Sequence, residues 1–173
     1  MNLQAHDRRQ FLRALTVGGS AVGALLLFPS AGLRAADETE ALLLSCMDYR
    51  LTDQTTRYMD KRGLKNKYDH IILAGAALGA LTEKFPAWNQ TFWDHVGVAS
   101  DLHKIRKIIV LDHRDCGAYK VLLGEDFAKD PAKETAIHAR HLKRLGKMIQ
   151  EKYPPLGVEL LLMALNGKVQ TIS

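Results

Sequence analysis

Two cysteines and a histidine are the side chains of this sequence best suited to bind a metal ion. Cys46 and Cys116 are the only cysteines among the 173 residues, and His113 lies three positions before the second. An apolar run that predicts a strand, 41–46, ends at the first cysteine, and another, 107–112, ends directly before the histidine. Zinc prefers thiolate and imidazole ligands, and three protein ligands leave a fourth position for water or substrate. The sequence therefore predicts a catalytic zinc site made of these residues.

Two charged residues beside the first cysteine could supply the acid–base help that such a site needs. Two thiolates formally neutralise Zn²⁺, which makes the ion a weaker Lewis acid and leaves more of the work to its neighbours. Asp48 could accept a hydrogen bond from zinc-bound hydroxide, or could bind the metal itself as a fourth ligand that closes the site. Arg50 could hold the Asp48 carboxylate in a bidentate ion pair, which would keep it ionised and off the metal.

Other interpretations of the two cysteines stay open at this point. Thiols without a metal could pair as a disulfide in an oxidising compartment, or could be buried as small apolar groups. A site with two cysteines, one histidine and one aspartate could also be closed and purely structural. The aspartate, arginine and histidine in this spacing favour metal binding over the first two interpretations.

The N-terminal residues have the three-part layout of an export signal. Arg8 and Arg9 form a twin arginine, the mildly apolar stretch 17–28 follows, and a region of small residues ends near Ala35. The apolar stretch is 12 residues long, too short to span a bilayer as a helix. The pattern predicts a twin-arginine signal peptide over 1–35, with an uncleaved anchor or a basic amphipathic helix as the alternatives.

A single domain over 36–173 is expected after cleavage, in the periplasm or otherwise exported, with no stable membrane association. The expected signal holds four arginines and one aspartate, so it accounts for +3 of the net charge of +5. The remaining domain is therefore only weakly basic, and it has no Lys/Arg tract with interleaved aromatic residues. Nucleic acid is not an expected partner.

Apolar runs alternate with helical patterns along the expected domain. This order predicts an α/β fold with a mostly parallel central sheet of about four to five strands, flanked by helices. Asn166-Gly167 predicts a two-residue hairpin turn between the last two strands. The sites of such sheets lie beyond the carboxyl ends of strands, where the strand order reverses. The expected strands are 41–46, 70–74, 107–112, 158–165 and 168–172, and the expected helices are 51–62, 86–104, 117–123 and 131–152.

Other residues that often serve in active sites receive a structural interpretation. His138 and His141 lie three positions apart on one expected helix, and we expect a satisfied or solvated pair. Trp88, Phe92 and Trp93 gather on another helix, where core or dimer packing is expected and a place in a substrate cleft is the alternative.

The motifs Cys46-x-Asp48-x-Arg50 and His113-x-x-Cys116-Gly117-Ala118 resemble those of the β-class carbonic anhydrases. The resemblance runs from about Leu42 through Tyr119 and is looser at the end of the chain. It implies that Cys46, His113 and Cys116 bind zinc and that Asp48 and Arg50 form a catalytic pair. It also implies that zinc-bound hydroxide attacks CO₂ to give bicarbonate and a proton, and that the protein is a homodimer.

Several positions around the motifs depart from the pattern of that family. The segment from Leu73 to Ala77 has none of the family's arginine and asparagine, Asp112 replaces a glycine, and Arg114 replaces serine or threonine. Because a relative that acts on CS₂ or COS uses the same machinery, a hydrolase of those molecules is an alternative function. A zinc-binding protein that has kept the fold without catalysis is another.

Overall fold

The computed structural model describes residues 39–173. The expected signal peptide, 1–35, lies outside the described residues, so that prediction stays untested. None of the helices within 39–173 has the length and apolar character required to cross a membrane.

A five-stranded sheet forms the centre of the described fold, with the strand order β2-β1-β3-β4-β5. The first four strands are parallel to their neighbours, and β5 runs antiparallel to β4. The predicted fold class, a mostly parallel sheet flanked by helices, is therefore confirmed. The strands are β1 (Ala41–Ser45), β2 (Tyr68–Ile72), β3 (Lys107–His113), β4 (Gly157–Met163) and β5 (Val169–Thr171).

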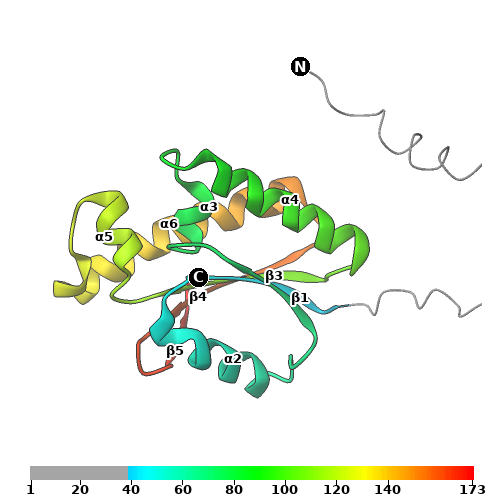
Figure 1. The fold of residues 1–173 in the computed structure, drawn as a ribbon, viewed down its shortest axis with the longest axis horizontal. Helices are drawn as coiled ribbons and strands as arrows, with labels where there is room; N and C mark the ends of the chain where they lie inside the picture. The colour runs from blue at the N-terminus through cyan, green and yellow to red at the C-terminus, as the bar shows by residue number, and fades with distance from the viewer. Residues whose placement is uncertain (1–38) are drawn as a thin grey trace, which may run out of the picture. The chain divides into compact units, whose positions relative to one another are not determined.

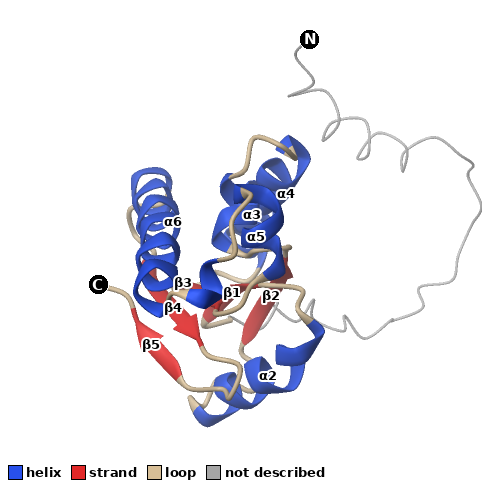
Figure 2. Ribbon diagram, turned by 90° about the vertical axis from the view of Figure 1, so that its left-hand side faces the viewer, coloured by secondary structure: helices blue, strands red, loops and turns tan. Residues whose placement is uncertain are grey.

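Helices cover both faces of the sheet. Helix α2 lies against one face, and α3, α4 and α6 lie against the other (Figures 1 and 2). The helical segments are η1 (Tyr49–Leu51), α2 (Thr52–Lys61), α3 (Ala77–Leu81), α4 (Pro86–Leu102), α5 (Gly117–Leu123), η2 (Phe127–Lys129) and α6 (Pro131–Lys152).

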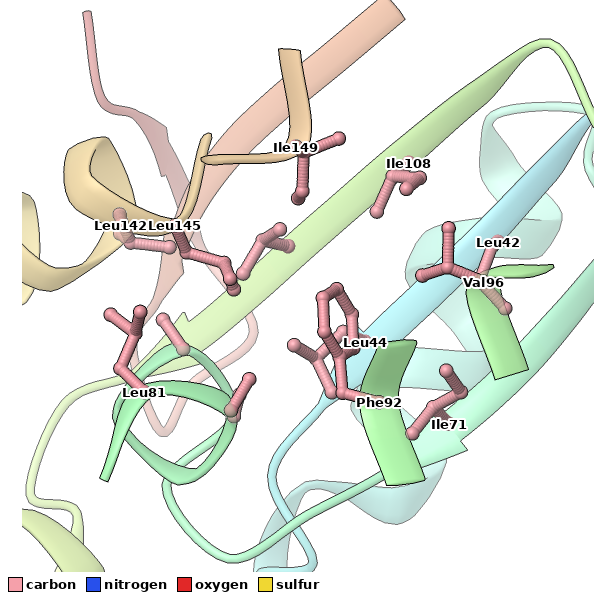
Figure 3. Packing of buried hydrophobic residues seen from close by; sticks show 14 of the residues in the cluster. Leu42, Leu44, Ile71, Leu81, Phe92, Val96, Ile108, Leu142, Leu145 and Ile149 are labelled. Atoms are coloured by element: carbon pink, nitrogen blue, oxygen red, sulfur yellow. The ribbon is translucent and has the colours of Figure 1, made fainter. Parts of the chain in front are cut away.

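The alternation of side chains along the strands divides the core into two layers. On β1, Leu42 and Leu44 face α4 and α6, where Phe92 and Leu145 are fully buried (Figure 3). The alternate residues of β1, Ala41 and Leu43, pack on the other face with Met59 of α2. Because both faces of the central strands are covered, the strands read as continuous apolar runs, as parallel strands usually do.

The strand order reverses between β1 and β3, which pair with each other in parallel. The chain leaves β1 to form β2 on one side and later returns to form β3 on the other. Cys46 follows β1 directly, and His113 is the last residue of β3. The fold therefore brings the two segments that carry the predicted ligands to the same edge of the sheet.

Several features differ from the sequence-based expectations. β2 begins and ends two residues earlier than the expected 70–74. The hairpin loop has three residues rather than two, because Ala164 N–H donates to the Lys168 carbonyl and Gly167 closes the loop with φ of 82°. This is the favoured three-residue connection, a turn followed by a left-handed glycine. Finally, a short helix, α3, follows β2, and it was not among the expected helices.

The small residues before and within α3 are required by close packing. An ideal Cβ on Gly79 would lie 2.4 Å from the carbonyl oxygen of Ala74, which is part of the backbone and cannot easily move. Ala76 enters the helix with φ of 39° and is fully buried. The Gly/Ala-rich segment therefore folds α3 tightly against the end of β2, beside the predicted metal site.

We expect Gly79→Ala to destabilise the protein by about 1–3 kcal/mol, because the added methyl group overpacks the contact with Ala74. Gly97→Ala in α4 is the matched control, since its Cβ would meet only the Tyr153 hydroxyl, at 3.7 Å. That change should leave stability equal or raise it by up to about 1 kcal/mol through helix propensity. Urea denaturation followed by circular dichroism measures both, and equal stability of the two variants would contradict the packing argument.

Candidate metal centre

Three ligand atoms converge at the edge where β1 and β3 end. The thiols of Cys46 and Cys116 and the imidazole of His113 lie within 4.8 Å of one another. The two sulfur atoms are 3.9 Å apart and are not bonded. Two thiolates on a tetrahedral zinc ion, each with a Zn–S distance of about 2.3 Å, would be separated by about 3.8 Å. The spacing thus fits a shared metal ion and differs from a disulfide, whose sulfur atoms lie about 2 Å apart.

The histidine is oriented with one nitrogen directed at this cluster. Its Nδ1–H donates to the carbonyl oxygen of Arg114 at 2.8 Å, which leaves Nε2 as the nitrogen with the free lone pair. Nε2 is buried and has no hydrogen-bond partner. Because an unpaired buried polar atom is costly, this nitrogen indicates a missing ligand. A zinc ion held by the two thiols and this nitrogen would supply it.

The electrostatics of the ligand cluster favour the replacement of a proton by a metal ion. A hydrogen bond from Cys116 lowers the pKa of Cys46 to about 4, with further help from His113 and from the Gly75 N–H, although burial opposes the shift. The same pairing raises the pKa of Cys116. A cation that binds both thiols must displace the protons that they carry. Burial works against a charge on His113, but the neighbouring Cys46 raises the pKa of its imidazole overall.

Asp48 and Arg50 form the bidentate pair that the sequence predicts. Arg50 Nε donates to Asp48 Oδ1 at 2.9 Å, and Nη2 donates to Oδ2 at 2.7 Å. The guanidinium group lowers the pKa of Asp48, so this carboxylate stays ionised. Asp48 Oδ2 lies 3.8 Å from His113 Nε2 and is outside the group of three metal-binding atoms. The pair is thus in place beside the candidate metal position, and its catalytic role remains a prediction.

Asp115 is a member of the site that the sequence reasoning missed. It lies between the two ligands of the second motif, and its carboxylate and carbonyl oxygen accept hydrogen bonds from Arg50 at 2.7 Å and 2.9 Å. Arg50 therefore joins the segment after β1 to the segment after β3. The sequence gives only a partial signal, an acidic residue near two candidate ligands, because the contact with Arg50 depends on how the fold places the turn.

Asp112, one of the departures from the family pattern, is the centre of a buried network. Its side chain accepts hydrogen bonds from the Ala77 N–H at 2.9 Å and the Tyr119 hydroxyl at 2.5 Å, and pairs with His138 Nδ1 at 2.8 Å. Burial, with Asp112 adding to it, raises the pKa of Tyr119 well above its usual range. The carboxylate thus ties β3 to α3, α5 and α6. His138 is a satisfied core histidine, as expected. His141 Nδ1–H donates to the carbonyl oxygen of Ile137 at 2.9 Å.

An apolar cleft of about 370 Å³ opens onto Cys46 and Asp48. Its walls include Met47, Val121 and an aromatic pair, Phe85 and Trp88, whose rings stack with centroids 4.3 Å apart. The expectation of core or dimer packing therefore holds for Phe92, which is fully buried, whereas Trp88 lines the cleft. The segment from Leu73 to Ala77 contributes only Ala74 to the walls, so no charged side chain takes the place of the family's arginine there.

We expect Cys46→Ser to reduce the zinc content from one ion per chain to nearly none, because serine replaces a thiolate ligand with a poorly ionised hydroxyl. Metal analysis after dialysis, with circular dichroism to confirm folding, measures this. Ser45→Ala is the neighbouring control, since the Ser45 hydroxyl pairs with His70 and with the backbone carbonyl of Cys46, and neither of these is a candidate ligand atom. Full zinc content in Cys46→Ser would show that the ligand assignment is wrong.

Comparison with known proteins connects this geometry to a family. A family model described as "Putative carbonic anhydrase" matches residues 36–173. An uncharacterized protein of Rickettsia conorii is 41% identical over 140 residues, which cover 81% of this chain and 75% of that protein.

Solved structures share the fold at low sequence identity. The β-carbonic anhydrase isoform I of Trichomonas vaginalis has a TM-score of 0.54 and 18% identity, with 95% of this chain and 92% of that chain covered. A tetrameric β-carbonic anhydrase of Sordaria macrospora has a TM-score of 0.53 and 13% identity, with 79% and 82% covered. The chain that carries this Cys-His-Cys cluster belongs to the carbonic anhydrase family as a divergent member with the β-class fold.

Proposed function

We propose that this protein is a zinc-dependent carbonic anhydrase that hydrates CO₂ reversibly to bicarbonate and a proton. The observation that carries the proposal is the buried, unpartnered Nε2 of His113, which points at two thiols and lies 3.8 Å from a carboxylate held by arginine. This donor set suits zinc, with Cys46, His113 and Cys116 as the ligands. When bound in such a site, zinc lowers the pKa of water and so makes a strong nucleophile available near neutral pH.

The residues around the ligands have separate tasks in this proposal. Asp48, kept ionised by Arg50, accepts a hydrogen bond from the nucleophile and orients it towards the cleft. Arg50 also prevents Asp48 from binding the metal, because both carboxylate oxygens are already engaged. The apolar cleft admits CO₂, which carries no charge, and limits the water that would compete for the site.

Asp48→Asn should keep its zinc and lose about 100-fold in the rate of CO₂ hydration, because the neutral amide is a weaker hydrogen-bond acceptor and its NH₂ group cannot accept from Arg50. Asp53→Asn in α2 is the control, since that side chain is 84% exposed and its ion-pair partner is Arg57, on the same helix. Stopped-flow hydration assays on the zinc-loaded protein measure both rates.

The same assay decides between the candidate functions. Absence of hydration at every pH from about 7 to 9, which brackets the pKa of zinc-bound and aqueous-zinc water, would contradict the carbonic anhydrase proposal. Turnover of CS₂ or COS by the same zinc-loaded protein would then support the hydrolase alternative, which the apolar cleft suits equally. If none of the three molecules reacted while zinc stayed bound, the non-catalytic alternative would hold.

We further propose that the protein is exported by the twin-arginine route as a homodimer. The arginine pair at Arg8 and Arg9 supports export. Exposed apolar side chains near the cleft support a dimer, since Met47 is 66%, Tyr49 86% and Val121 76% exposed. Export in the folded state would allow the thiols to be metallated before they reach an oxidising compartment.

Native mass spectrometry of the protein purified from the exported fraction tests these expectations together. We expect a dimer of chains that begin near residue 36, with one zinc ion in each chain. Replacement of Arg8 and Arg9 by lysine should abolish export and leave the full-length chain in the cell. A full-length exported chain would contradict cleavage, and a monomer at micromolar concentration would contradict the dimer.

A further inference from the structure

The turn between His113 and Cys116 forms hydrogen bonds on both of its sides. Asp115, at its centre, has φ of 55°, in the left-handed region that residues with a side chain rarely adopt. On one side, its carboxylate and carbonyl oxygen accept hydrogen bonds from Arg50. On the other side, its own N–H donates to Glu134 Oε1 at 2.6 Å. The backbone position of Asp115 therefore depends on a residue of α6.

Glu134 is a buried carboxylate that is fully engaged. The residue is 4% exposed, and its second oxygen, Oε2, accepts a hydrogen bond from Arg114 Nη1 at 2.9 Å. Arg114 also donates to Thr135 Oγ1 at 2.8 Å. A buried carboxylate is tolerated when a cation and hydrogen bonds satisfy it, and Arg114 and Asp115 together do so. Arg114, another departure from the family pattern, thus has a structural partner in this chain.

The helix that carries Glu134 is a firm support. The Asp130 side chain caps α6 by accepting from the N–H groups of Ala132 and Lys133. Leu142, Leu145 and Ile149 of the same helix are fully buried against the sheet. Glu134 therefore lies in the first turn of an element that is fixed at its start and packed along its length.

The Asp48–Arg50 pair needs such support, because it is only partly shielded. The Arg50 side chain is 34% exposed, and exposed ion pairs are weak and mobile on their own. Asp48 lies 3.8 Å from His113 Nε2, so a small shift of the pair would bring the carboxylate onto the metal position. The contact with Asp115 anchors the other end of Arg50 and opposes that shift.

We propose that Glu134, oriented by Arg114, is a positioning residue that keeps the Asp48–Arg50 pair off the metal by fixing the Asp115 turn. The connection runs through contacts of 2.6 to 2.9 Å from Glu134 to Asp115, from Asp115 to Arg50 and from Arg50 to Asp48. This role rests on the proposed zinc site and on the proposed function of Asp48.

The experiment uses two variants of the exported protein. Glu134→Ala removes both hydrogen bonds of the carboxylate. Glu134→Gln keeps the size of the side chain, but its single amide oxygen can serve Asp115 or Arg114 and not both. Glu159→Ala is the matched control, because Glu159 also joins two cations, Arg62 and Lys107, and has no contact with the site.

Cobalt-substituted protein gives a readout that does not depend on turnover. Thiocyanate that binds to an open metal position changes the visible spectrum of the cobalt ion, whereas a carboxylate that occupies the position competes with it. We expect Glu134→Ala to weaken thiocyanate binding by about tenfold, Glu134→Gln to weaken it less, and Glu159→Ala to match the wild type. The rate of CO₂ hydration by the zinc forms should fall in the same order, with zinc content unchanged.

Thiocyanate affinity and hydration equal to wild type in Glu134→Gln, and in Glu134→Ala if it folds, would overturn the positioning role. If Glu134→Ala does not fold, Glu134→Gln alone decides between the two outcomes. A wild-type protein that binds thiocyanate through cobalt and does not hydrate CO₂ would overturn the proposed function. In that case the order of thiocyanate affinities still decides whether Glu134 positions the pair.

Discussion

The parallel pairing of β1 with β3 is the constraint on which the rest of the site depends. It joins residues that are about 66 positions apart in the chain, such as Leu44 with Val110, and it places the ends of both strands at one edge. Cys46 and His113 become neighbours through this pairing alone, before any contact among side chains is considered. The strand order also turns at this point, so the loops that leave β1 and β3 diverge and leave room for a cleft.

Charged side chains connect the loops of the site to the helices behind them. Arg50 bridges the segments after β1 and β3, and Glu134 extends this bridge to α6. Asp112 does the same inside the core, where one carboxylate meets groups from α3, α5 and α6. Buried carboxylates of this kind contribute geometric definition rather than much net stability, because desolvation offsets most of their attraction. The candidate site therefore has a polar frame around two thiols that could bind a metal ion.

The sequence predicted the parts of this protein that follow from local patterns. The apolar runs located the strands, and the two motifs with their strand ends indicated which side chains would meet, as the 3.9 Å between the sulfur atoms confirms. Asp115 and Glu134 could not be assigned in this way, because their roles depend on a left-handed turn and on the docking of α6, both set by tertiary structure. Helix α3 was missed because its five residues are too few to show a helical repeat of apolar and polar positions. Its conformation depends instead on close packing against Ala74. The three-residue hairpin differs from expectation because, within the loop 165–167, only Gly167 has a positive φ, whereas the type I′ two-residue turn requires it at both central residues.

The separation of the two cysteines along the chain has a consequence for the persistence of the fold. They are 70 residues apart, and an ion bound to both would act as a removable cross-link that encloses the α2, α3 and α4 segments. Closing a loop of this length in the unfolded chain removes entropy worth on the order of 4 kcal/mol, by analogy with a disulfide. A large part of the net stability of a domain this size can therefore reside in the metal. Chelators would then act as denaturants, because a chain that loses the ion would also lose much of the stability that keeps it folded.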